Sequence, residues 1–139
     1  MSGPSDVLAR VSLFEGLAPK ELEALGRTVS ERRFRAGQQL AGEGETGAGF
    51  FVLASGEATV SVDGEERRTL GPGHWFGELA LIEGGTRTAT VTATSDGVAY
   101  GLTSWQFRPL VEEHTALAWP LLQQLAGRIR ELEQRQRNQ

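Results

Sequence analysis

The residues in this sequence best suited to hold a ligand are an acid and an arginine, Glu78 and Arg87, at either end of a short glycine-bounded segment. Residues 76–82, Phe-Gly-Glu-Leu-Ala-Leu-Ile, predict a single helical turn between two strands, ended by Gly84-Gly85. Free N–H groups at the start of such a turn attract an anion. A guanidinium offers forked donors suited to phosphate, whereas a carboxylate accepts hydrogen bonds from hydroxyl groups. The combination indicates a ligand with both a phosphate and a free sugar hydroxyl.

The middle of the chain, residues 30–103, consists of short strand-like runs that would carry this segment. Val60 and Val62 alternate with polar residues, which is the period of a half-buried strand. The Asp63-Gly64 pair that follows indicates a hairpin turn. Regular turns between short strands favour a sandwich, a jelly roll or a barrel.

Helical patterns flank the strand region on both sides. Residues 1–29 have the apolar spacing of short helices, one of which begins with Pro19 in its first turn, where the missing N–H costs least. Residues 104–139 are predicted to be helical, with Ser104 as the N-cap.

The last predicted helix carries one apolar stripe. Its members follow one another at alternating spacings of four and three residues: Ala118, Leu122, Leu125, Ile129 and Leu132. Such a stripe packs either against the core of its own chain or against the same helix of a second copy. The spacing leaves both interpretations open.

Composition argues against several classes of function. A net charge of -4 disfavours a general nucleic-acid-binding surface. The chain has no cysteine, and its two histidines, His74 and His114, lie far apart in the sequence, so no metal site is predicted. No nucleophile and base are spaced for catalysis, so we do not expect an enzyme. The Gly-x-Gly-x-x-Gly pattern at 42–47 precedes a strand instead of a helix, which indicates a tight turn and not a dinucleotide site.

Location follows from the same survey. No apolar run approaches the roughly 18 residues that span a bilayer. The first residues lack the basic and apolar pattern of a secretory signal. We therefore expect a cytoplasmic protein with no membrane partner.

Two ordered motifs resemble a known family. Residues 76–81, Phe-Gly-Glu-Leu-Ala-Leu, and residues 87–93, Arg-Thr-Ala-Thr-Val-Thr-Ala, resemble the phosphate-binding cassette of cyclic-nucleotide-binding domains. Such domains occur in protein kinase A regulatory subunits, cyclic-nucleotide-gated channels and the sensor domains of catabolite activator proteins. Upstream, residues 40–47 and 50–53 resemble that family's turn and following core strand, with Ala41 where a larger aliphatic residue is usual.

The resemblance implies a mainly β fold with flanking helices, in one domain spanning residues 1–139. N-terminal helices (1–29) would precede an eight-stranded β-roll, a double-stranded β-helix of the jelly-roll and cupin type (30–103). The roll would contain the cassette at 76–91, and C-terminal helices (104–139) would form a lid.

The resemblance also implies a ligand, cAMP or cGMP, and a role for each cassette residue. Glu78 would accept a hydrogen bond from the ribose 2′-hydroxyl, and Arg87 would pair with the cyclic phosphate. Gly77 would let the ligand approach closely because it has no side chain. Backbone N–H groups of three residues would complete the phosphate cradle: Leu79, Ala80 and Ala89.

The base of the ligand would lie between apolar walls and the lid. Val60 and Leu70 would form the walls, and Arg128 and Leu132 of the last helix would contact the base. Thr88 keeps cGMP open beside cAMP, because several cGMP-preferring sites carry threonine there while many bacterial-type sites with serine or threonine bind cAMP.

These residues predict a cyclic-nucleotide receptor that needs no cofactor beyond its ligand and signals through movement of its C-terminal helices. The partners expected are an effector protein of unknown identity and a second copy bound through the last helix. DNA binding is not expected because no helix-turn-helix follows that helix. The alternative is a dimerisation or docking module that kept the fold but binds no nucleotide.

Overall fold

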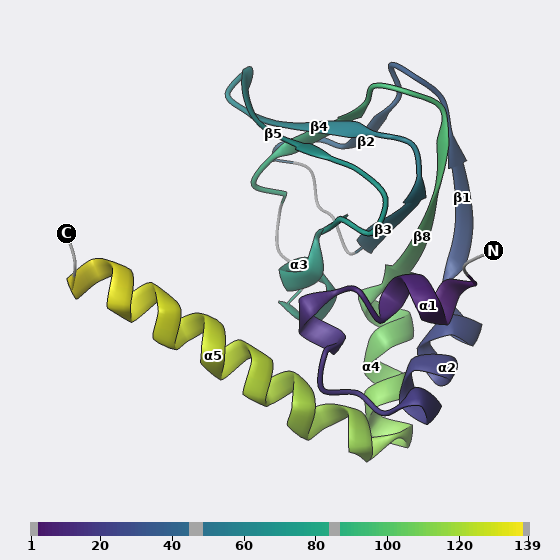
Figure 1. Ribbon diagram of the computed structural model, residues 1–139, viewed down its shortest axis with the longest axis vertical. Helices are drawn as coiled ribbons and strands as arrows, with labels where there is room; N and C mark the ends of the chain where they lie inside the picture. The colour runs from purple at the N-terminus through teal and green to yellow at the C-terminus, as the bar shows by residue number, and fades with distance from the viewer. Residues whose placement is uncertain (1–2, 45–48, 84–86, 138–139) are drawn as a thin grey trace.

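Two antiparallel sheets form the centre of the computed structural model, which describes residues 3–44, 49–83 and 87–137 (Figure 1). In this part of the chain, sheet A has the strand order β1-β8-β3-β6 and sheet B the order β2-β7-β4-β5. The strands are β1 (Ser30–Phe34), β2 (Gln39–Ala41), β3 (Gly49–Ser55), β4 (Ala58–Val62), β5 (Glu65–Leu70), β6 (Trp75–Phe76), β7 (Thr90–Ala93) and β8 (Gly97–Thr103). The expected fold class, an eight-stranded β-roll with flanking helices, is confirmed.

Two residues with positive φ make the turn of the β4–β5 hairpin. Asp63 has a φ of 52° and Gly64 a φ of 78°. A type I′ turn requires left-handed conformations at both central positions, and Asp-Gly adopts them readily. The resulting register places Val60 directly opposite Arg68, and a bulge follows between Val60 and Ser61.

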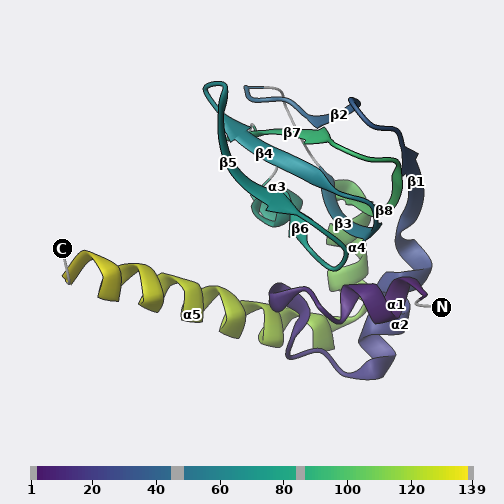
Figure 2. The ribbon, with the colours of Figure 1, turned by 45° about the horizontal axis from the view of Figure 1, so that its top comes forward.

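The helices before and after the roll pack together against sheet A (Figures 1 and 2). They are α1 (Pro4–Leu8), η1 (Ser12–Phe14), α2 (Pro19–Thr28), α4 (Ser104–Glu113), η2 (Thr115–Leu117) and α5 (Ala118–Arg137), while α3 (Glu78–Glu83) follows β6. The predicted start of a helix at Pro19 is confirmed, with Ala18 as its N-cap.

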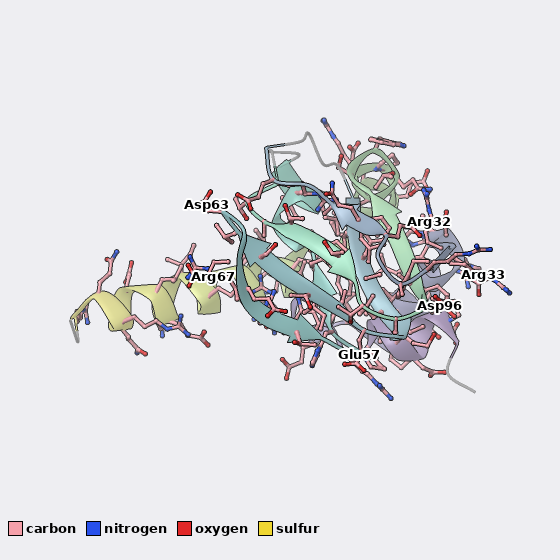
Figure 3. The ribbon with its side chains drawn as sticks, turned by 90° about the horizontal axis from the view of Figure 1, so that it is seen from above. Arg32, Arg33, Glu57, Asp63, Arg67 and Asp96 are labelled. Atoms are coloured by element: carbon pink, nitrogen blue, oxygen red, sulfur yellow. The ribbon has the colours of Figure 1, made fainter. Side chains whose placement is uncertain are left out.

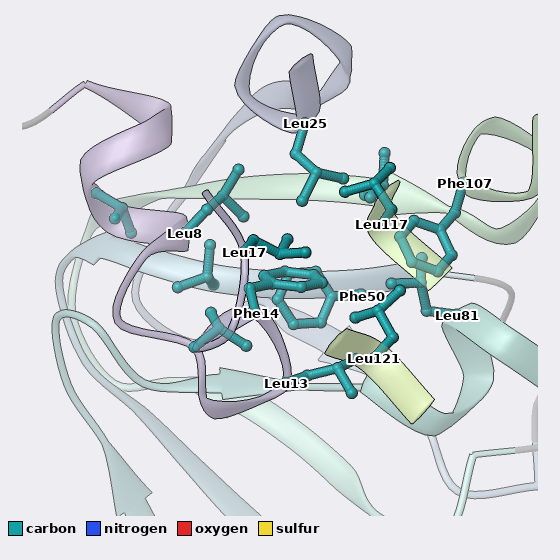
Figure 4. Close-up of a cluster of buried hydrophobic side chains, with 14 residues drawn as sticks. Leu8, Leu13, Phe14, Leu17, Leu25, Phe50, Leu81, Phe107, Leu117 and Leu121 are labelled. Atoms are coloured by element: carbon teal, nitrogen blue, oxygen red, sulfur yellow. The ribbon is translucent and has the colours of Figure 1, made fainter. Parts of the chain in front are cut away.

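Three phenylalanines from distant parts of the chain join the helices to the sheet (Figure 4). The rings of Phe14 and Phe50 meet edge to face at 5.7 Å, and the ring centroids of Phe14 and Phe107 lie 6.4 Å apart. A second core fills the inside of the roll; among its members are Phe34, Leu53, Phe76 and Val91. The roll and its helices therefore have separate cores that meet across sheet A.

The N-cap of α4 is Thr103 and not Ser104. The Thr103 hydroxyl accepts a hydrogen bond from the Gln106 backbone N–H at 3.3 Å, and the Gln106 side chain accepts one from the Thr103 backbone N–H at 3.0 Å. This reciprocal pair is a capping box, which needs a glutamate or glutamine three residues after the cap. Ser104 lacks that partner because Phe107 occupies the corresponding position.

The apolar stripe on α5 packs only in part against the core of its own chain, through Leu125. Leu121 is the buried residue of this helix, whereas Leu122, Ile129 and Leu132 are each more than half exposed. Figures 1 and 2 show α5 running away from the roll toward its C-terminal end. Of the two interpretations of the stripe, packing in the chain's own core is therefore wrong for these three residues. None of the helices in the described residues combines the length and apolarity needed to cross a membrane.

Candidate functional site

Gly77 forms the tight junction between β6 and α3. Its φ is +85°, a conformation that L side chains rarely adopt. Its carbonyl accepts the first helical hydrogen bond of α3, from the N–H of Leu81 at 3.1 Å. A Cβ atom at Gly77 would lie 2.5 Å from the carbonyl oxygen of Gly49 and would collide with Nη1 of Arg87. Both the backbone and the space around it therefore require glycine.

The guanidinium of Arg87 lies against Gly77, at the start of α3. Its Nη2 lies close to Gly49 of β3, 3.6 Å from where a Cβ atom of that residue would be. The Arg87 carbonyl accepts a hydrogen bond from the N–H of Gly44 at 3.0 Å, which holds its backbone beside the turn that follows β2. The structure thus brings a forked cationic donor to a turn whose backbone can receive an anion.

The turn after β2 connects the two predicted motifs. Glu43 donates its backbone N–H to the hydroxyl of Thr90 at 3.1 Å, next to the cassette strand β7. Its carboxylate accepts a hydrogen bond from the N–H of Asp63 at 2.8 Å, in the β4–β5 turn. The motif at 40–47 therefore borders the cassette, although residues 45–48 lie outside the described residues.

Comparison with known proteins decides the family. The family model for the cyclic nucleotide-binding domain matches residues 31–114. The chain belongs to the cyclic nucleotide-binding domain family. The family is one of regulatory ligand-binding domains.

The relatives include proteins named for cAMP and proteins named for cGMP. The chain is 28% identical over 130 residues to a CRP-like cAMP-activated global transcriptional regulator of Mycobacterium tuberculosis, covering 90% of this chain and 58% of that protein. It is 38% identical over 86 residues to a cGMP-dependent protein kinase of Toxoplasma gondii, covering 62% of this chain and 9% of the kinase. The chain thus spans little more than half of the first relative and a small part of the second.

A solved structure resembles nearly the whole chain. The N-terminal domain of a transcriptional regulator from Streptomyces coelicolor A3(2) superimposes with a TM-score of 0.85 at 31% identity, covering 93% of each chain. The similarity therefore extends over the flanking helices as well as the β-roll.

The cassette residues differ in how much the structure describes of them. Glu78 and Leu79 begin α3, but their side chains lie outside the described part, so the role of the Glu78 carboxylate stays a prediction. Ala80 is buried, Ala89 packs against the core of the roll, and Thr88 is exposed beside Arg87.

The predicted apolar walls lie inside the roll. Arg68, which the sequence pattern did not indicate, lies beside one of them. Val60 and Leu70 are both buried in the inner core. Arg68 is exposed and lies directly opposite Val60, so the two share one face of sheet B. A two-residue turn at Asp63-Gly64 predicts the pairing of β4 with β5 only as far as Ser61 opposite Glu66. The bulge between Val60 and Ser61 then shifts the register by one residue, so Arg68 lies opposite Val60.

The two residues predicted to contact the base both lie on α5. Arg128 donates a hydrogen bond to the hydroxyl of Ser12 at 3.1 Å, on the N-terminal helical segment. Leu132 is 56% exposed on the part of α5 that runs away from the roll (Figure 2). Their contact with the base stays a prediction.

Proposed function

We propose that this domain binds cAMP or cGMP and acts as a regulatory module without converting its ligand. The observation that carries the proposal is the Arg87 guanidinium held against Gly77 at the start of α3. The cyclic phosphate would lie on Arg87 and on backbone N–H groups of Leu79, Ala80 and Ala89, and Glu78 would accept the ribose 2′-hydroxyl. The names of the cAMP-activated and cGMP-dependent relatives support a cyclic nucleotide as ligand.

The choice between the two bases would depend on Thr88 and Arg68. A guanidinium pairs in bidentate fashion with O6 and N7 of guanine, whereas adenine offers a donor in place of O6. Arg68 shares the face of sheet B that carries the proposed apolar wall at Val60. We infer that this arginine favours cGMP over cAMP, with the Thr88 hydroxyl as a second donor.

Calorimetric titration of the purified chain, stripped of bound nucleotide, tests the function. cAMP, cGMP and 5′-AMP are compared on the same preparation. Micromolar or tighter binding of a cyclic form, with much weaker binding of 5′-AMP, supports the receptor, and the ratio of the cAMP and cGMP affinities tests the inference on Arg68. Folded, empty protein that binds neither cyclic form would instead favour the docking module.

The output of the proposed receptor would pass through Leu81. This residue of α3 is 1% exposed and belongs to the same buried cluster as Phe107, Leu117 and Leu121 (Figure 4). A ligand that pulls the cassette inward would therefore move side chains that support α4 and α5. Such a ligand shifts the helices only by its difference in affinity for the two arrangements. We propose that an effector protein in the cytoplasm recognises the new arrangement.

Leu81→Ala should separate ligand binding from this output. Removing a buried leucine side chain costs about 2–5 kcal/mol of stability. We expect cyclic-nucleotide affinity to change by only a few-fold, because the Leu81 side chain is buried in the helical core. The ligand-induced change in hydrogen exchange on α4 and α5 should be lost. Leu25→Ala, another fully buried leucine of the same cluster, should lose similar stability yet keep that change. An unchanged response in Leu81→Ala would contradict the route through α3.

We also propose that α5 pairs with α5 of a second copy. The exposed stripe formed by Leu122, Ile129 and Leu132 has the spacing of a two-helix seam. Ile129→Lys should shift the chain from dimer to monomer in sedimentation velocity. Gln134→Lys, on the opposite face of the same helix, should leave the dimer intact. A wild-type chain that stays monomeric at all concentrations would refute this pairing.

A further inference from the structure

One side of the roll is open, between the edge strands β1 and β2. β1 is the outer strand of sheet A and β2 is the outer strand of sheet B. A cavity of about 170 Å³ lies between them, and its apolar lining is Phe34, Leu40, Phe51 and Ala99. This surface belongs to neither the cassette nor α5.

Arginines border this opening. Residues 30–35, Ser-Glu-Arg-Arg-Phe-Arg, carry a net charge of +2 in a chain whose net charge is -4. Figure 3 shows Arg32 and Arg33 at this edge, and both line the cavity between β1 and β2. Arg33 and Arg35 also line a neighbouring open cavity of about 580 Å³. The edge therefore combines an apolar opening with a concentrated positive charge.

These arginines are weakly neutralised by their surroundings. The ion pair of Arg33 is with Glu31, at 3.9 Å between two exposed side chains, a geometry that contributes little. Across residues 3–44, 49–83 and 87–137, Arg32 and Arg35 make no ion pair. Asp96 is the acidic residue in the lining of the larger cavity, and one of its carboxylate oxygens accepts a hydrogen bond from the Ala36 N–H at 3.0 Å.

The backbone of β1 is available to a further strand. β1 pairs with β8 from Ser30 opposite Gly101 to Phe34 opposite Gly97, and no other described strand lies beside it. Every second N–H and C=O of an edge strand points away from its sheet. Like charges disfavour pairing with a second β1, because arginines would then face arginines. The same charges favour a strand that carries carboxylates.

We propose that the β1 edge binds an extended acidic segment of a partner protein. The segment adds to sheet A as a further strand. Its carboxylates contact Arg33 and Arg35 on the outer face, and an apolar side chain on its other face enters the cavity between β1 and β2. Electrostatic attraction between the arginines and the acidic segment selects the partner and speeds the encounter.

The test uses the whole chain and a fluorescent peptide in which glutamate alternates with valine. Peptide binding is measured by fluorescence anisotropy. The double variant Arg33→Glu/Arg35→Glu should lower peptide affinity by at least about tenfold. Thermal unfolding and cyclic-nucleotide titration should not change, because both side chains are exposed and β1 pairs with β8 and not with a cassette strand. Arg67→Glu, an exposed arginine of the edge strand β5, is the matched control and should bind the peptide like the wild type.

A second peptide separates strand addition from simple charge attraction. It keeps every glutamate but replaces the valines with proline, which cannot donate a hydrogen bond to a neighbouring strand. We expect it to bind at least about tenfold more weakly than the valine peptide. Four results would overturn the proposal: no valine-peptide binding at about 1 mM, equal weakening by Arg67→Glu, equal binding of the proline peptide, or binding of phosphatidylserine vesicles in place of the peptide.

Discussion

Arg87→Ala should weaken cyclic-nucleotide binding by about 30-fold to several thousand-fold. Removing one partner of a desolvated charge pair costs about 2–5 kcal/mol, which corresponds to that range of affinity. The phosphate would keep its backbone donors on α3 but lose the forked cation that lies against Gly77. Calorimetric titration with cAMP and cGMP measures the loss.

Two further variants make this result specific. Arg87→Lys keeps the charge but not the forked geometry, so its affinity should lie between those of the wild type and Arg87→Ala. Arg108→Ala removes an exposed arginine of α4 that pairs with Glu112, and it should bind like the wild type. Equal affinity of Arg87→Ala and the wild type, with both chains folded, would refute the proposed phosphate site.

Gly77→Ala should weaken cyclic-nucleotide binding at least as much as Arg87→Ala and should also destabilise the fold. An alanine at this position would have to adopt a φ of +85°. Its Cβ atom would collide with both the Gly49 carbonyl and the Arg87 guanidinium. The left-handed conformation alone costs a non-glycine residue about 1–2 kcal/mol, and the collisions add to that cost. Displacing Arg87 would remove the phosphate contact as well, so we expect the effect on binding to equal or exceed that of Arg87→Ala.

Gly64→Ala is the matched control for this substitution. Gly64 has a similar φ of 78°, but a Cβ atom there would meet nothing within 4 Å. It should therefore show the conformational cost in chemical denaturation and leave ligand binding intact. If Gly77→Ala and Gly64→Ala had equal effects on stability and on binding, close packing around Gly77 could not be the reason for its glycine.

Local features of the fold could be predicted because their causes are local. Asp63-Gly64 forms a type I′ turn because its two residues tolerate positive φ. Pro19 begins α2 because the first turn of a helix needs no N–H there. The N-cap of α4 was predicted one residue late, since capping depends on a specific reciprocal contact between Thr103 and Gln106.

Much of the candidate site was also contained in the sequence. The spacing and types of Gly77, Glu78 and Arg87 predict an anion-binding turn, and the structure brings Arg87 against Gly77. The position of Arg68 beside Val60 could not be predicted, because the face of sheet B on which its side chain lies depends on the register of β5 against β4, and a bulge alters that register. Periodicity within one strand does not determine which residue of the neighbouring strand lies opposite each of its residues.

The sequence by itself determined the order of helices and strands, the glycine-bounded turn and the kinds of donor and acceptor near it. The tertiary structure decided which of these lie together: Arg87 meets Gly77 and Gly49, and the exposed stripe of α5 turns away from the core. The physical reason is the range of the interactions. Turns and caps depend on a few neighbouring residues, whereas the contacts of Arg87 with β3 and the start of α3, or the direction of α5, depend on how whole layers pack.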